Sequence, residues 1–171
     1  GSPSQMYITS TAGCGSDGNW ESYNTTKSWT LSQTNATATV YVKYQDQAGN
    51  ESSCAYDTII HDDIAPSLPT GLALISPTQS TSNNPTPEIE VSGVTQQDTI
   101  SLHTESNCSV VSEKDSKLAT GATIRLKSSS LSEGTHSFYA KAVDPAGNET
   151  CSSLSVSYTL DTTAPNAPTC L

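Results

Sequence analysis

The chain contains the same pattern twice, about one hundred residues apart. The segment 41–52, YVKYQDQAGNES, returns as 139–150, YAKAVDPAGNET. The segment 64–72, IAPSLPTGL, returns as 163–171, TAPNAPTCL. The offsets within these pairs are 98 and 99 residues. A period of this length is that of a small domain and is far longer than one turn of a solenoid, so the sequence predicts tandem copies of one domain.

The second copy shows the hydrophobic pattern of β-strands. Apolar residues alternate with polar ones at a period of two, and no segment keeps a period of 3.6 residues. The predicted strands occupy 71–75, 85–91, 99–103, 122–126, 137–144 and 154–160. Short strands separated by turn signals every 8–12 residues or so are typical of a β-sandwich. We therefore predict an all-β fold.

Two motifs in this copy resemble those of a known family. The fifth strand ends in DPAGN at 144–148, and the sixth runs into DTTAP at 161–165. These residues are similar to bacterial immunoglobulin-like repeats of large surface adhesins and secreted proteins. The resemblance implies tandem immunoglobulin-like β-sandwich domains at the cell surface or outside the cell. It also implies a non-catalytic role as a stalk, spacer or adhesive module.

The turn and the linker have physical reasons for their composition. Glycine and asparagine tolerate the positive φ of a tight hairpin, and aspartate accepts hydrogen bonds from turn amides. The predicted turn caps are therefore Asp46, Asn50, Asp144 and Asn148. Proline fixes φ and lacks an amide donor, so the Ala-Pro-x-x-Pro segments predict short, stiff linkers.

The first copy lacks its opening strands. Segments 6–10, 28–31, 39–46 and 56–60 match the later strands of the second copy, but nothing before Met6 matches the first two. The expected organisation is an incomplete domain at 1–63, a Pro-rich linker at 64–70, a complete domain at 71–162, and a linker with the start of a third repeat at 163–171.

An incomplete sandwich exposes one inner face, here including Val40, Val42 and Tyr44, and leaves an unpaired edge. Two explanations stay open. The chain is a fragment with a boundary inside a domain, or a neighbouring chain supplies the missing strands. The second would make the protein a subunit of a strand-complemented fibre that self-associates through its first domain.

Composition and charge exclude several kinds of partner. Charged residues make up 14% of the chain, the formal net charge is −10, and the seven basic residues are scattered. A nucleic-acid partner is therefore not expected, because binding to phosphates needs clustered lysine and arginine. No apolar run approaches the roughly 20 residues of a membrane span, so we expect no membrane insertion by this segment. The absence of a signal peptide predicts an excerpt from a longer precursor.

Four of the five cysteines form equivalent pairs. Cys14 and Cys108 follow matching strands, and Cys54 and Cys151 follow the Ala-Gly-Asn turns. Repeated cysteines without histidine partners indicate disulfides and an oxidising compartment. We favour bonds within each domain, although the end of the third strand and the start of the last normally lie at opposite ends of a sandwich. A bond from Cys14 to Cys151 therefore stays open. Cys170 is left over, as a free thiol or bonded elsewhere.

Enzyme chemistry finds no support in the sequence. His61, His103 and His136 lie on different elements, and there is no nucleophile motif, phosphate loop or metal-binding histidine pair. The chain is predicted not to be an enzyme and to need no organic cofactor. The resemblance does imply one inorganic candidate, a structural calcium ion at the domain junctions. Its ligands would be Asp62, Asp63 and Asp161, since calcium prefers oxygen ligands.

The segment after Cys14 is the candidate for recognition of a host or prey cell-surface glycan or protein. An aromatic residue can stack on a sugar while polar side chains supply hydrogen bonds. The candidate ligand-binding residues are Asp17, Asn19, Trp20, Glu21 and Tyr23. The alternative is that the two aromatic residues pack in a short strand beside 6–10. Trp29 alternates with Leu31 and is expected in the core.

Overall fold

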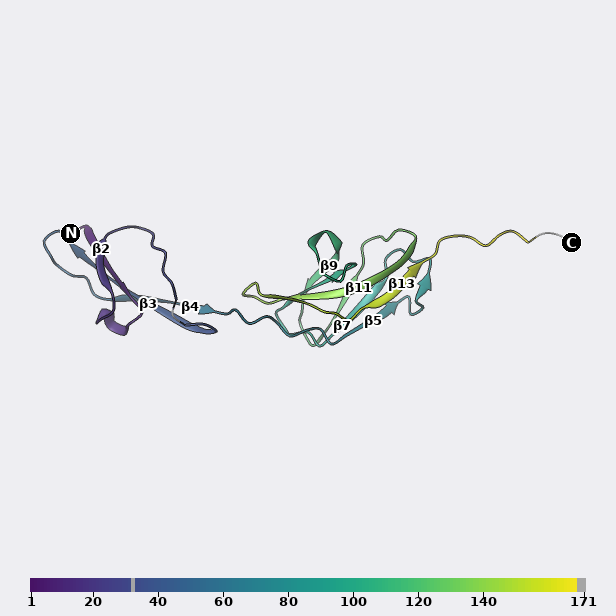
Figure 1. The fold of residues 1–171 in the computed structure, drawn as a ribbon, viewed down its shortest axis with the longest axis horizontal. Coiled ribbons are helices and arrows are strands. Elements are labelled where there is room, and N and C mark those ends of the chain that lie inside the picture. Colours follow the sequence, from purple (N-terminus) through teal and green to yellow (C-terminus); the bar gives the residue numbers. More distant parts are fainter. Residues whose placement is uncertain (32, 169–171) are drawn as a thin grey trace. The chain divides into compact units, whose positions relative to one another are not determined.

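The fold was obtained as a computed structural model, which describes residues 1–31 and 33–168. The chain divides into two compact units, Gly1–Ile64 and Ala65–Leu171. Figure 1 labels several strands of each unit. The only helical segments in the described residues are the short 3-10 turns η1 (Ala12–Cys14) and η2 (Val110–Ser112). No helix in the described part of the chain has the length and apolar character needed to cross a membrane.

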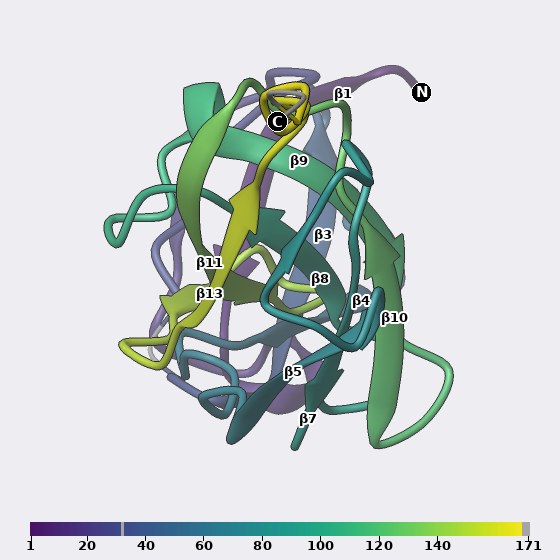
Figure 2. The same ribbon diagram turned by 90° about the vertical axis from the view of Figure 1, so that its right-hand side faces the viewer.

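The C-terminal unit is a β-sandwich, which confirms the predicted fold class. Its strands are β5 (Gly71–Ser76), β6 (Thr81–Ser82), β7 (Glu88–Ser92), β8 (Thr99–His103), β9 (Glu113–Leu118), β10 (Thr123–Lys127), β11 (Gly134–Val143), β12 (Glu149–Cys151) and β13 (Val156–Leu160). One sheet has the order β10-β7-β5, and the other β6-β13-β11-β8-β9, with β12 beside β11. Figure 2 shows β5, β7 and β10 on one side of this unit and β11 and β13 on the other.

The core lies between these two sheets. Alternate residues of each strand face inward, because successive side chains of a strand point to opposite faces. Ile89 and Leu126 of one sheet pack with Leu102, Phe138 and Tyr158 of the other, and all five are fully buried. The Tyr158 hydroxyl donates a hydrogen bond to the Asn84 carbonyl at 2.6 Å, which satisfies its polar end.

The described residues of the N-terminal unit form a single sheet, which corresponds to one of the two sheets of the C-terminal unit. Its strands are β1 (Pro3–Thr9), β2 (Asn19–Ser22), β3 (Ala36–Asp46) and β4 (Ala55–His61), in the order β2-β1-β3-β4. This order matches β9-β8-β11-β13 of the C-terminal unit. Among the described residues, the N-terminal unit has no counterpart of the β10-β7-β5 sheet.

Two predictions for the segment between β2 and β3 are wrong. Residues 28–31 form no strand, and Trp29 is 37% exposed instead of buried. In the C-terminal unit the corresponding strand, β10, forms its ladder with β7. The N-terminal unit has no strand equivalent to β7 in its described residues, so this segment has no backbone partner and cannot close a core around Trp29.

The inner face of the N-terminal sheet is partly covered. Met6 is buried, Val40 and Val42 are half-buried, and Tyr44 is 37% exposed. The expected exposure of this face therefore holds for Tyr44 and only in part for the two valines. Ala38 is fully buried on the same face, where it pairs with Ile59 of β4.

Candidate functional site

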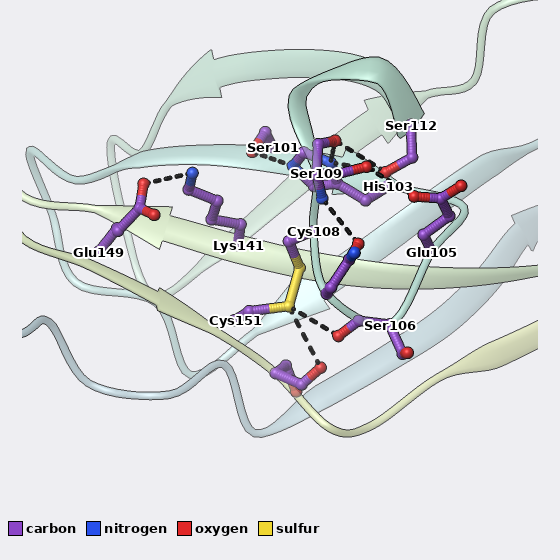
Figure 3. The surroundings of a disulfide bond; sticks show 12 residues. Ser101, His103, Glu105, Ser106, Cys108, Ser109, Ser112, Lys141, Glu149 and Cys151 are labelled. Carbon is purple, nitrogen blue, oxygen red and sulfur yellow. Dashed lines mark hydrogen bonds and ion pairs between the residues drawn. A yellow bond between two sulfur atoms is a disulfide. The ribbon is translucent and has the colours of Figure 1, made fainter.

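Within residues 1–31 and 33–168, each unit contains one disulfide bond. Cys14 bonds to Cys54 and Cys108 to Cys151, with Cα atoms 5.9 Å and 6.0 Å apart. The expectation that these cysteines lie at opposite ends of the sandwich is wrong for this chain. The short strand β12 turns back along β11 and places Cys151 opposite Lys141, whose partner on β8 is Ser101. The cysteine thus comes within reach of the loop after β8 (Figure 3).

That loop, residues 104–112, is held by several hydrogen bonds besides the disulfide. The Cys108 amide donates to the Glu105 carbonyl at 3.0 Å, and the Ser109 hydroxyl donates to the Glu105 carboxylate at 2.6 Å. At its end, in η2, Val110 and Val111 are 85% and 89% exposed. The loop is therefore tied down by these bonds and leaves two apolar side chains in solvent.

His103 anchors the base of this loop. Its ring is buried, with Nδ1 3.0 Å from the Ser109 carbonyl and Nε2 2.7 Å from the Ser101 hydroxyl. A carbonyl only accepts, so Nδ1 carries the proton and Nε2 accepts from Ser101. Burial lowers the pKa of His103 below its ordinary value, which keeps the ring neutral. This histidine has a structural role in the loop, and its nitrogens are both occupied.

The two aromatic candidates for recognition, Trp20 and Tyr23, do not lie on one surface. Trp20 lies opposite Tyr7 with ring centroids 5.5 Å apart, and Lys43 Nζ is 5.4 Å from the Trp20 ring. Tyr23 packs against Tyr44 at 5.7 Å. Tyr44 pairs with Met6, whose side chain points away from that of its neighbour Tyr7, so Trp20 and Tyr23 lie on opposite faces of the sheet. The two rings cannot stack on one sugar together.

Three of the predicted polar residues instead surround a hollow beside Trp29. Asp17, Asn19 and Glu21 line a space of about 150 Å³ together with Ile8, Gly18, Lys27 and Trp29. Lys27 Nζ pairs with the Glu21 carboxylate at 2.6 Å. Hydrogen bonds from Thr11 and Ser16 lower the pKa of Asp17. The sequence interpretation missed Trp29 as a site residue because it was taken to be part of the core.

Comparison with known proteins assigns the family. A family model described as a bacterial Ig-like domain matches residues 73–162, more than half of the chain. The chain belongs to the bacterial Ig-like domain family. The resemblance seen in the sequence motifs is thereby confirmed. No curated protein matches the chain. A solved structure described as "D00-D0 domain of Intimin" matches at 12% identity, with a TM-score of 0.33, over 90% of this chain and 78% of that one.

The turns of this bacterial Ig-like chain are capped by aspartate. The Asp46 carboxylate accepts hydrogen bonds from the Ala48 and Asn50 amides at 2.9 Å and 3.0 Å. The Asp144 carboxylate accepts the Asn148 amide at 2.9 Å and its side-chain nitrogen at 3.0 Å. These bonds stabilise the ionised form and lower the pKa of both aspartates.

The pKa of one buried carboxyl in the Ig-like domain is shifted in the opposite direction, upward. Asp98, directly before β8, is 3% exposed, and its Oδ2 has no hydrogen-bond partner in the described part of the chain. Burial and the nearby Asp144 charge raise the pKa of Asp98. Nothing in the sequence distinguishes Asp98 from an ordinary turn residue, because its burial depends on how the loops pack.

The acidic residues proposed for calcium lie in the segments that follow β4 and β13. The Asp62 carboxylate accepts the Ile64 amide, and the Asp161 carboxylate accepts the Thr163 amide, both at 3.0 Å. The Asp63 amide donates to the Asn35 side chain at 2.8 Å. Within residues 1–31 and 33–168, no three histidine, cysteine, aspartate or glutamate side chains gather as a metal site would require. The prediction for Cys170 lies outside the described residues.

Proposed function

We propose that the chain is a stalk or spacer module of a bacterial surface or secreted protein, where it holds a binding region away from the cell. Membership of the bacterial Ig-like family and a disulfide in each unit support this role, because structural disulfides persist outside the reducing cytoplasm. A spacer must also resist tension along the chain.

The observation that carries the proposal is the parallel pairing of β6 with β13. Thr159 and Leu160 pair with Thr81 and Ser82. The Thr159 amide donates to the Ser80 carbonyl at 2.7 Å, and the Asp161 amide donates to the Ser82 carbonyl at 3.0 Å. Tension between the two ends of the unit pulls parallel strands in opposite directions along their length. These bonds therefore bear load together instead of breaking one after another.

Stretching single molecules tests this proposal. The oxidised C-terminal unit is expected to unfold at a distinct force peak. Its disulfide keeps 43 residues out of the extended chain, so the extension should be about 150 Å shorter than in the reduced protein. Thr159→Pro, which removes the bond to Ser80, should lower the force, whereas Ser157→Pro, outside the β6 pairing, is the matched control. Extension without a force peak in the oxidised protein would contradict the spacer role.

A second candidate is direct recognition of a glycan, favoured by the hollow beside Trp29. One wall is aromatic and 37% exposed, and the others carry amide, carboxylate and ammonium groups. A few polar groups around an apolar wall are typical of small-ligand sites.

A glycan array with two tryptophan variants tests this candidate. Trp29→Ala is expected to abolish binding, because the stacking surface is lost, while Trp20→Ala retains it, since Trp20 is on the opposite face. Circular dichroism of both variants controls for folding. Loss of binding in Trp20→Ala alone would refute the assignment to Trp29, and an array without signal for the wild type would refute glycan recognition.

A further inference from the structure

The turn before β11 holds the segment that leaves the C-terminal unit. Glu133 accepts four hydrogen bonds from two consecutive residues just beyond β13. The Thr162 amide donates to its two oxygens at 3.0 Å and 3.2 Å, the Thr162 hydroxyl donates at 2.5 Å, and the Thr163 hydroxyl donates at 3.2 Å. A single carboxylate thus fixes both residues at the point where the chain leaves the sandwich.

The N-terminal unit has one hydrogen bond at the corresponding position, made by a different side chain. Asn35, in the turn before β3, accepts the Asp63 amide through Oδ1 at 2.8 Å. Asn35 lies 98 residues before Glu133, and Asp63 lies 99 residues before Thr162. These are the offsets of the two repeated motifs, so the contact occupies one position of the repeat and is made by an amide in one unit and a carboxylate in the other.

We infer that this contact is an exit anchor, which fixes the direction of the linker relative to the unit that it leaves. In both copies the anchored residue is followed within three positions by an Ala-Pro pair. Proline restricts φ and the conformation of the residue before it. The anchor and the proline together leave few free torsions at the exit. The inference gives the proposed spacer role a source of stiffness and rests on that role only for its biological meaning.

The two anchors respond differently to acid. Hydrogen bonds from Thr162 lower the pKa of Glu133, because they favour the ionised carboxylate. The other titratable groups around it are Asp161, at the end of β13, and His136, whose Nε2 bonds to the Ser132 carbonyl at 2.8 Å. The folded pKa of Glu133 is below the unfolded one. Its contribution is therefore complete at neutral pH and is lost as the pH falls through that lowered pKa. The Asn35 anchor carries no charge to lose.

Backbone NMR of the whole chain tests the anchor. The heteronuclear NOE of Thr162 and Thr163 is expected to be as high as in β13 at pH 7. It should fall to the values of a mobile terminus once the pH is below the lowered pKa of Glu133. In Glu133→Ala these two residues should be mobile at every pH, while the amides of β11 and β13 keep their shifts. Glu133→Gln should keep intermediate order without a pH step. Asn35→Ala should free residues 62–64 and leave Thr162 and Thr163 unchanged.

Three outcomes would overturn the inference. They are unchanged order at Thr162 in Glu133→Ala, a transition at or above the ordinary glutamate pKa, and a pH step that persists in Glu133→Gln, which would assign the titration to Asp161. Loss of order in Glu133→Ala together with no force peak on stretching would retain the anchor and refute only the spacer role.

Discussion

Replacing Cys108 and Cys151 by serine is expected to lower the free energy of unfolding of the C-terminal unit by about 4 kcal/mol. The bond closes a loop of 43 residues, and opening it returns that loop's entropy to the unfolded chain. The bond also ties down the loop that carries Val110 and Val111. Urea denaturation followed by hydrogen exchange at β11 and β13 measures the change, with the wild type in reductant as the control. A loss below about 1 kcal/mol would mean that the unfolded unit stays compact without the bond.

The matched variant in the N-terminal unit should behave more severely. The bond from Cys14 to Cys54 spans 40 residues, so the entropic term is almost the same. This unit, however, has one sheet in its described residues and a partly covered inner face. We expect Cys14→Ser with Cys54→Ser to unfold the unit at 37 °C. Both tryptophans lie in this unit, so their fluorescence reports it alone. Native fluorescence in the double variant would contradict this expectation.

Much of the sandwich could be predicted because apolar and polar residues alternate within most of its strands. The alternation at 71–75 and 99–103 predicts β5 and β8 almost to the residue. Alternation records which side chains face a core, and Ile100 and Leu102 of β8 are both fully buried. The same reasoning predicted β3 and β4, whose residues repeat the pattern of β11 and β13.

The missed and misplaced strands share a different physical cause. β9 has the sequence EKDSKL, without an apolar face, and is held by its ladder to β8. β6 is two residues long and exists through its pairing with β13. The segment 28–31 shows the opposite case, because its alternation is strandlike but no strand of the described residues pairs with it. A pattern predicts which face of a strand is buried, and a strand needs a partner as well.

The candidate sites depended on contacts that the sequence could not reveal. Trp20 contacts Tyr7 and Tyr23 contacts Tyr44, and these partners place the two rings on opposite faces of the sheet. The exit anchors join residues about 30 positions apart through a side chain. A signal for them did exist, since Asn35 and Glu133 occupy the same position of the repeat. Asparagine and glutamate in surface turns are too common to have marked it.

The difference between the two units can be measured at one position of the repeat. Phe138 is fully buried between the two sheets, where it pairs with Val156 and contributes to the core. Phe138→Ala is expected to lower the free energy of unfolding of the C-terminal unit by about 4 kcal/mol, through lost burial and the cavity that remains.

Val40 occupies the equivalent position, 98 residues earlier, and is only half-buried. Val40→Ala should therefore cost the N-terminal unit about 1 kcal/mol or less, since a partly exposed side chain leaves no closed cavity and loses little apolar burial. Urea denaturation measures both variants, with hydrogen exchange for Phe138→Ala and tryptophan fluorescence for Val40→Ala. The loss of unfolding free energy can be divided by the number of carbon atoms removed in each variant. Equal values for Phe138→Ala and Val40→Ala would contradict the difference in packing. Val40 would then lie in a core as closed as that around Phe138.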